Sequence, residues 1–339
     1  MKADLFKYKL PKERIAKYPP EIRGTSKLLV FDRETGEIEH NQYFDIVEYI
    51  RPGDIVVLNE TRVLDARTYF MTPKGKEVEV LFLNRDGENW FCLIGGGRYV
   101  TESEILEAKE GKDIKIKVIS RKDRGFLVEI LGDVTPNDIF IKIGHTPIPP
   151  YMNRKDDDKD RERYNTVFNK LPGSSAAPTA SLNLTEDIIN KLRNKGVKIV
   201  KINLEIGWGT FAPIKEEDVE EHQIHEEYIE ISKEVAEEIN RTKAEGGDVW
   251  AFGTTVVRAL ESATNDMVRN YSGNTDLYIY PGYKFKVVDH LITNFHFPDS
   301  TLILLVSAFV GIEEIKKLYN IALERDYKFL SYGDSMLII

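Results

Sequence analysis

The sequence predicts an α/β protein: a large domain with a mixed or largely parallel sheet, and a small antiparallel β-barrel inserted into it. Two observations lead to this fold class. Between residues 76 and 131, short strands of alternating polar and apolar residues are joined by turns that contain Gly and Asp, which is typical of a small barrel. From about Thr185 onward, helical and strand patterns alternate, and this alternation favours parallel strands.

The barrel prediction rests on two hairpin-like segments. Residues 76–84 and 90–95 flank the turn RDGEN, and residues 113–131 repeat the arrangement around the turn RKDRG. Cys92 falls inside one of these strands and is expected in the barrel core. The predicted division of the chain is residues 67–146 for the barrel and residues 1–66 and 147–339 for the large domain.

The clearest helix of the second half follows Thr185. Thr185 is a typical N-cap, Gly196 lies just past the helix end, and Ile188, Ile189 and Leu192 fall on one face. Further strands are expected at residues 197–206 and 248–252, and further helices at residues 233–245, 256–268 and 313–326.

Composition and charge exclude several classes of protein. The chain has 42% hydrophobic and 30% charged residues, which is typical of a globular protein. Its net charge of −9 argues against coating nucleic acid through bulk electrostatics, although a local basic surface remains open. A single cysteine, a charged N-terminal segment and a longest apolar run of only residues 302–310 predict a cytoplasmic protein without a membrane anchor.

The segment 154–163, RKDDDKDRER, carries mixed charge and fits no predicted element. A solvated loop is the ordinary interpretation of such a run, and a substrate-facing flap is the alternative.

Three segments rich in small residues are expected at the ends of strands. They are residues 173–185, 205–214 and 252–262, and each contains Ser or Thr. Ligands of open α/β sheets bind beyond the carboxyl ends of the strands, so we expect the three segments to share a pocket. No phosphate-binding loop and no G-x-S-x-G elbow is present, and a serine hydrolase is therefore poorly supported.

The few histidines narrow the possible chemistry. His222 and His225 are three residues apart beside Glu226, and an i, i+3 pair on a helix could bind a metal. No third ligand follows at a recognised spacing, so we expect no metal, and a structural or acid–base role is favoured. His296 lies close to Asn294 between apolar residues, where a buried structural histidine is the alternative to a catalytic one.

A series of motifs extends over nearly the whole chain. In order they are YKLPKERIAKYPPEIRGTSKLLV, GDIVVLNETRVLDAR, TPIPPYMNR, RYNTVF, GSSAAPTA, GWGTFAPI, HQIHEEY, GTTVVRALES, TDLYIYPGYKFKVVDHLITNFHFPDSTLILLVSAF and SYGDSMLI. Taken together they resemble the S-adenosylmethionine:tRNA ribosyltransferase-isomerase (QueA) family of queuosine biosynthesis. The resemblance implies transfer and isomerisation of the ribosyl part of S-adenosylmethionine onto 7-aminomethyl-7-deazaguanine at the wobble position of tRNA. Epoxyqueuosine-tRNA forms, and adenine and methionine leave.

This resemblance implies S-adenosylmethionine as a co-substrate, no permanently bound cofactor and no metal. A sulfonium acidifies the C5′–H bond, so a base is needed there, and an acid assists departure of adenine. The candidate catalytic groups are Glu205, His222, His225, Glu226 and His296. The candidate substrate-binding residues are Ser174, Ser175, Ala176, Pro178, Thr179, Asn183, Gly207, Trp208, Gly209, Thr210, Phe211, Gly253, Thr254, Thr255, Arg258 and Asn294.

Contacts with tRNA phosphates are expected from Lys27, Arg62 and Arg67, which lie in the N-terminal motifs. Ion pairing at the surface is the alternative for these three residues.

Several positions depart from the usual family motifs. Asn183 and Glu205 stand where the family has histidine, and Ala212 stands where it has Arg or Gln. If the family reaction is kept, Glu205 serves as a base or holds the sulfonium together with Trp208, through charge and cation–π attraction. The alternatives are a paralogue that binds S-adenosylmethionine but acts on another acceptor, or an inactive relative that only binds tRNA.

Overall fold

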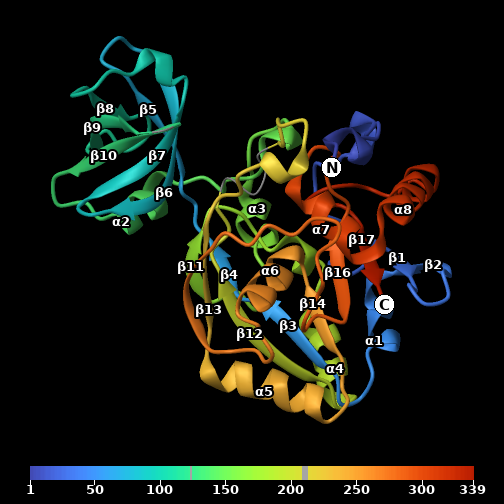
Figure 1. The fold of residues 1–339 in the computed structure, drawn as a ribbon. Coiled ribbons are helices and arrows are strands. Elements are labelled where there is room, and N and C mark those ends of the chain that lie inside the picture. The colour runs from blue at the N-terminus through green and yellow to red at the C-terminus, as the bar shows by residue number, and fades with distance from the viewer. Residues whose placement is uncertain (123, 208–212) are drawn as a thin grey trace.

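The computed structural model describes residues 1–122, 124–207 and 213–339, and it confirms the predicted fold class. Within these residues a nine-stranded mixed sheet carries helices on both faces, and a six-stranded barrel closes on itself beside it (Figure 1). The two parts are joined by the chain before β5 and after α2.

The large sheet has the strand order β15-β13-β12-β3-β14-β16-β17-β1-β2. Its strands are β1 (Lys27–Phe31), β2 (Ile38–Gln42), β3 (Ile55–Asn59), β12 (Lys198–Leu204), β13 (Glu227–Ile231), β14 (Val249–Phe252), β15 (Tyr271–Thr275), β16 (His290–Asn294) and β17 (Ser335–Ile338).

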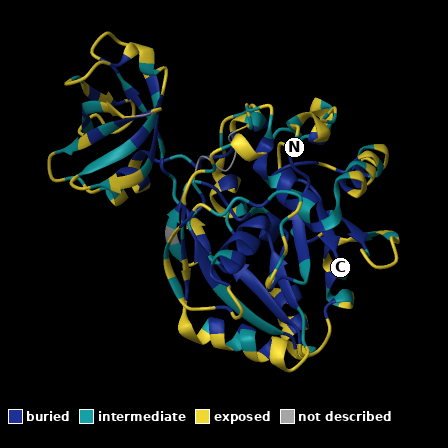
Figure 2. Ribbon diagram, in the orientation of Figure 1, coloured by how far each residue is buried: buried dark blue, intermediate teal, exposed yellow. Residues whose placement is uncertain are grey.

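Its centre is parallel. β12, β3, β14 and β16 all run in the same direction, so their carboxyl ends meet at one edge. β3 is buried along its whole length, because alternate residues enter two cores. Ile55 and Val57 pack into the core that includes α6, whereas Val56 and Leu58 pack into the core that includes α4. Figure 2 shows this buried centre and the exposed outer side of α5.

The helices are α1 (Ile46–Tyr49), α2 (Pro136–Ile143), α3 (Asp158–Arg163), α4 (Glu186–Asn194), α5 (Lys233–Ala244), α6 (Thr254–Ser262), α7 (Thr301–Val310) and α8 (Ile312–Glu324). The predicted N-cap of α4 is present, because the Thr185 hydroxyl accepts a hydrogen bond from the N–H of Ile188 at 3.2 Å. No helix in the described part of the chain is both long and apolar enough to cross a bilayer.

The helix expected at residues 256–268 is wrong at both ends, since α6 begins at Thr254 and ends at Ser262. The side chain of Asn240 in α5 explains the early end. Its amide donates to the carbonyl of Val268 at 2.8 Å and accepts from the N–H of Val268 at 2.9 Å. These bonds take the backbone groups that a longer helix would need.

The charged segment 154–163 is also not the loop that its composition predicts. α3 begins after Asp157, whose side chain accepts from the N–H groups of Lys159 and Asp160. The Asp160 carboxylate is 1% exposed and forms a bidentate pair with Arg154, at 2.6 and 2.7 Å. This pair closes the segment on itself, and the Tyr332 hydroxyl, which donates to the Asp160 carboxylate at 2.8 Å, holds it against the large domain.

The barrel follows the order β10-β7-β6-β5-β8-β9. Cys92 of β7 is fully buried and pairs with both Phe82 and Phe126, as expected of a core residue. The domain bounds at residues 67 and 146 stay a prediction. The barrel strands are β5 (Arg67–Met71), β6 (Glu77–Asp86), β7 (Asn89–Gly95), β8 (Ile105–Ala108), β9 (Lys115–Lys122) and β10 (Gly125–Leu131), while β4 (Thr61–Val63) and β11 (Leu171–Ser174) form a separate parallel pair.

Asp160→Ala is expected to lower the free energy of unfolding by about 3 kcal/mol, because it leaves the Arg154 guanidinium, in a side chain only 9% exposed, without its counter-charge. Glu237→Ala is the control, since it removes an exposed partner of Lys233 and should change stability little. Urea denaturation followed by circular dichroism measures both. Equal midpoints for the two variants would contradict a stabilising role for the buried pair.

Candidate functional site

The carboxyl ends of the central strands surround a narrow space, here called the strand-end cavity, of about 30 Å³. Ile206 lies two residues past the end of β12, Gly253 directly follows β14, and β16 ends at Asn294. The three segments that the sequence places at strand ends therefore line one cavity. Its lining residues are Ala177, Pro178, Thr179, Ala180, Ile206, Gly253, Thr254, Thr255, Thr293, Asn294, His296 and Leu302.

Leu302, which lines the strand-end cavity, also lines two further cavities. The inner cavity, of about 270 Å³, is lined by Tyr151, Thr179, Pro213, Asn294, His296, Phe297, Pro298, Asp299, Ser300, Leu302, Leu330 and Ser331. The arginine cavity, of about 10 Å³, is lined by Ile224, His225, Arg258, Tyr278, Ile279, Thr301, Leu302 and Leu305.

Three buried polar atoms at these cavities have no hydrogen-bond partner among the described residues. They are Oδ1 of Asn294, Oγ1 of Thr255 and Nη2 of Arg258, in side chains whose residues are 2%, 8% and 5% exposed. Leaving such an atom unpaired costs about 1–3 kcal/mol. A bound ligand that pairs with them would recover this free energy, so the three atoms indicate a binding site.

The other nitrogens of Arg258 are occupied. Nη1 forms a buried ion pair with Glu227, and Nε donates to the carbonyl of Leu277 at 3.1 Å. The pair fixes the guanidinium and leaves Nη2 as a donor beside His225. This arrangement suits a carboxylate or another anion.

His296 is a neutral imidazole in this site. Burial lowers the pKa of His296 to about 3, and its Nε2 forms a hydrogen bond with the Thr293 hydroxyl at 2.8 Å. Its main chain is held by the hydroxyl groups of Tyr319 and Tyr8. His296 can therefore orient a neutral ligand, but near neutral pH it carries no extra proton to donate.

Gly253 shapes the start of α6. Its φ of +106° is a conformation that side chains rarely adopt, and a Cβ there would lie 3.5 Å from Cβ of Ala180. Glycine at this position lets α6 begin directly at the end of β14.

The small residues at 173–175 serve packing within the protein. A Cβ on Gly173 would lie 2.8 Å from the carboxyl group of Glu205. The Ser174 hydroxyl accepts from the N–H of Ile206 at 2.8 Å, and the Ser175 hydroxyl donates to the carbonyl of Ile206 at 3.1 Å. These bonds anchor β11 to the segment after β12, whereas residues 177–180 line the strand-end cavity.

Comparisons with known proteins decide the family. The family described as Queuosine biosynthesis protein matches residues 3–338. S-adenosylmethionine:tRNA ribosyltransferase-isomerases of Acetivibrio thermocellus and Clostridioides difficile are 46% and 45% identical, over 100% of this chain and of each relative. The chain belongs to this family.

A solved structure agrees with this assignment. The crystal structure of S-adenosylmethionine tRNA ribosyltransferase from Thermotoga maritima matches with a TM-score of 0.57 and 32% identity, over 99% of this chain and 100% of that one.

The candidate catalytic side chains of this family member do not all lie at the same cavities. His296 and His225 line the cavities around Leu302, but Glu205 lies against Gly173 instead. Burial raises the pKa of Glu205, and the nearby Glu230 raises it further.

His222 and His225 do not share a helix face, because residues 222–226 belong to no helix. His222 forms a hydrogen bond with Glu216 at 2.8 Å, and this contact lowers the pKa of Glu216 to about 2. Glu226 is exposed and accepts from Asn274 at 2.9 Å. In the described ranges no three His, Cys, Asp or Glu side chains group as metal ligands.

Other predicted residues lie apart from the cavities or beyond description. Asn183 is buried, and its amide donates to the carbonyl of Gly333 at 3.4 Å. Ala176 is buried and lines a different cavity near the barrel, together with Ser175 and Arg67. The N–H of Gly207 donates to Glu227 at 3.3 Å. Trp208, Gly209, Thr210 and Phe211, with Ala212, lie outside the described residues.

The three candidate tRNA contacts differ in their surroundings. Arg67 pairs with Glu79 at 3.2 Å and its side chain is only 11% exposed, which fits the ion-pairing alternative. Arg62 is exposed. Lys27 directs Nζ to the carbonyl of Arg325 at 2.7 Å.

Sequence reasoning missed several residues of the inner cavity. Tyr151, Phe297, Leu302 and Ser331 line it but were not among the candidates. Each of these residues falls within one of the family motifs quoted above, and membership of a motif could have identified them as candidates.

The low pKa of His296 predicts a specific pH dependence of stability. The unfolded chain takes up a proton at an ordinary imidazole pKa of 6.5 and the folded chain only at about 3. The contribution of neutral His296 to the free energy of unfolding is complete above pH 6.5. It is lost, at about 1.4 kcal/mol per pH unit, as the pH falls from 6.5 toward about 3.

His296→Gln should therefore make the free energy of unfolding, measured by urea titration, less dependent on pH between 6.5 and about 3. Thr293→Val is the control, because it removes the hydrogen-bond partner but keeps the titrating imidazole. Parallel pH profiles for wild type and His296→Gln would contradict the buried neutral imidazole.

Proposed function

We propose that this chain transfers and isomerises the ribosyl moiety of S-adenosylmethionine onto 7-aminomethyl-7-deazaguanine in tRNA. The products are epoxyqueuosine-tRNA, adenine and methionine. Membership of the family and the full-length similarity to the ribosyltransferase-isomerases support this activity.

The observation that carries the proposal is the inner cavity with the unpaired Asn294 oxygen. The exocyclic amino group of adenine is a donor that suits this buried acceptor. Phe297 and Tyr151, whose rings meet edge to face at 5.3 Å, supply the apolar wall that a purine needs. We therefore assign the adenine of S-adenosylmethionine to the inner cavity.

The arginine cavity offers a hydrogen-bond donor to the other end of the same molecule. Nη2 of Arg258 suits the carboxylate of the methionyl part, while Glu227 already balances much of the guanidinium charge. Because the cavities share Leu302, one extended ligand could reach both.

In this arrangement His225 is the base that removes the proton from C5′. A neutral imidazole can accept the proton from C5′, and His225 lies on the same cavity as Arg258. The aminomethyl nitrogen of the deazaguanine then bonds to a ribosyl carbon and loses a proton. The bond between C5′ and sulfur breaks, so methionine leaves with its sulfur and the electron pair of that bond, and adenine leaves C1′ and takes up a proton. His296 orients the ligand and does not supply that proton.

The departures from the family motifs support retention of the reaction. Asn183 and Glu205 contact Gly333 and Gly173, and neither lines the inner, strand-end or arginine cavity. The altered positions that the structure describes therefore lie beside the proposed ligand site and not within it.

Adenine release tests the activity. Purified protein should release adenine from S-adenosylmethionine when tRNA carrying 7-aminomethyl-7-deazaguanine is present, and not with unmodified tRNA. Release without tRNA, or no release despite tight binding of S-adenosylmethionine, would contradict the proposed function and favour a different acceptor.

Arg258→Lys tests the assignment of the carboxylate in the same assay. The variant keeps the positive charge but loses the planar fork, so KM for S-adenosylmethionine should rise about tenfold. Arg269→Lys makes the same change at an exposed position and should leave KM unchanged. An unchanged KM in Arg258→Lys would place the methionyl carboxylate elsewhere.

A further inference from the structure

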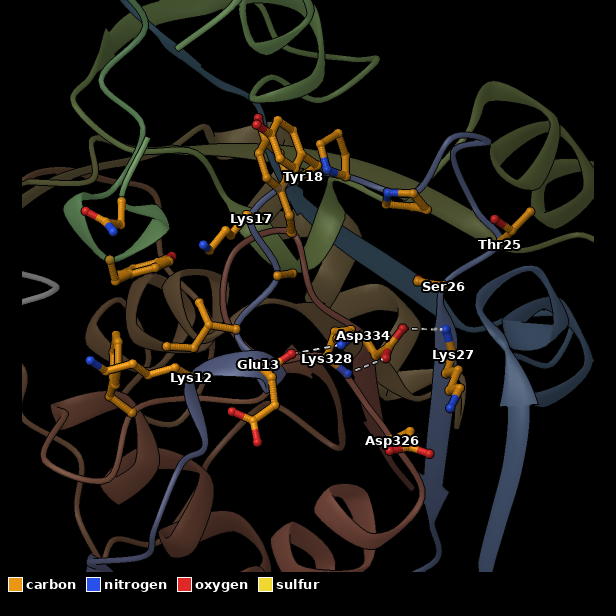
Figure 3. A pocket seen from close by; sticks show the side chains of 18 of the residues that line it. Lys12, Glu13, Lys17, Tyr18, Thr25, Ser26, Lys27, Asp326, Lys328 and Asp334 are labelled. Atoms are coloured by element: carbon orange, nitrogen blue, oxygen red, sulfur yellow. Dashed lines mark hydrogen bonds between the residues drawn. The ribbon is translucent and has the colours of Figure 1, made fainter. Parts of the chain in front are cut away.

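A larger cavity opens beside the inner cavity and has no assigned role. This outer cavity, of about 1260 Å³, lies between the N-terminal segment 12–27, the loop at 150–153 and the segment 326–334 (Figure 3). Tyr151 and Phe297 line both the outer and the inner cavity, so the two spaces adjoin.

Four lysines line the outer cavity, against three carboxylates. Lys12 and Lys17 are exposed, and neither Nζ forms a hydrogen bond or ion pair with any residue that the structure describes. Nζ of Lys27 and Nζ of Lys328 donate to neutral backbone carbonyls, at 2.7 and 2.9 Å.

The carboxylates of the same cavity are largely occupied. Asp334 is buried and accepts from the N–H groups of Lys27 and Lys328, at 2.7 and 2.6 Å. Asp326 pairs with Arg14. Glu13 is the exposed exception. Four lysines against three carboxylates, one of them paired with Arg14, give this cavity a small excess of positive charge on a chain of net charge −9. Such a local excess can attract an anion.

An exposed aromatic ring stands among these lysines. Tyr18 is 60% exposed, and the guanidinium of Arg154 lies 4.2 Å from its ring centroid. The pair with Asp160 holds Arg154 in place, and Pro19 and Pro20 restrict the backbone that follows Tyr18. The ring is thus part of a preorganised platform.

Lysines along a groove with an aromatic platform are the features that bind single-stranded nucleic acid. The cations contact phosphates, and the ring stacks on a base of any sequence. We propose that the outer cavity binds single-stranded RNA through Lys12, Lys17 and Tyr18. The identity of that RNA rests on the proposed function: it is the anticodon-loop nucleotides that flank the modified base.

Binding of an unmodified anticodon stem–loop RNA, measured by fluorescence anisotropy at several salt concentrations, tests the proposal without any turnover. The double variant Lys12→Ala/Lys17→Ala should weaken binding about tenfold and reduce the slope of log K against log salt by about 1.4, as expected for two lost phosphate contacts. Tyr18→Ala should also weaken binding about tenfold but leave the slope unchanged.

Lys74→Ala/Lys112→Ala is the matched control. It removes the same charge from exposed positions in or beside barrel turns and should bind the RNA nearly as wild type does. Equal affinities for the cavity variant and the barrel variant would overturn the proposal, because net charge alone would then explain any loss.

Adenine release by the same preparations separates this proposal from the proposed function. If the cavity variants keep the wild-type KM for modified tRNA, the outer cavity is not the RNA site, although the activity stands. If wild type releases no adenine but RNA binding still depends on Lys12, Lys17 and Tyr18, the proposed function fails and the RNA site stands.

Discussion

The parallel register of four central strands is the constraint on which the site depends. Because β12, β3, β14 and β16 run in one direction, the segments that follow three of them are brought to one edge. The hydrogen bonds of Ser174 and Ser175 to Ile206 then add the chain after β11 to the same edge.

Burial at this edge determines what the site can bind. It keeps His296 neutral and makes the unpaired oxygen of Asn294 and the unpaired nitrogen of Arg258 costly unless a ligand pairs with them. Glu227 offsets the charge of Arg258, so the interior offers directional hydrogen bonds rather than a strong net field. A cationic sulfonium can enter such a cavity without meeting an uncompensated positive charge.

The outer cavity has the opposite character. Lys12 and Lys17 are exposed, and neither side chain has a partner among the described residues. The proposed arrangement therefore keeps the anionic backbone of RNA outside and the sulfonium inside, with Tyr151 and Phe297 at the boundary. This separation allows two oppositely charged substrates to approach a common point.

The sequence predicted the features that local patterns determine. The alternation of the barrel strands and the Thr185 cap of α4 are examples, and both are present in the structure. It did not predict the end of α6, which depends on Asn240 of another helix, or α3, which the buried Arg154–Asp160 pair stabilises.

In the candidate site, too, the sequence did not predict contacts between side chains that lie far apart in the chain or point in a direction set by packing. Strand order brings His225, Asn294 and Arg258 to neighbouring cavities, and their motifs identified them. The direction of the Glu205 side chain depends on its packing against Gly173, which residue type alone does not reveal. His222 likewise pairs with Glu216 six residues before it, a contact that the i, i+3 spacing to His225 obscured.

A crystal structure of the protein with S-adenosylmethionine bound tests the central claim most directly. The account predicts adenine in the inner cavity, with its amino group within hydrogen-bond distance of Asn294 Oδ1 and the methionyl carboxylate at Arg258. Density for the nucleoside beside Glu205 and Gly173, with Asn294 and Arg258 still unpaired, would contradict it.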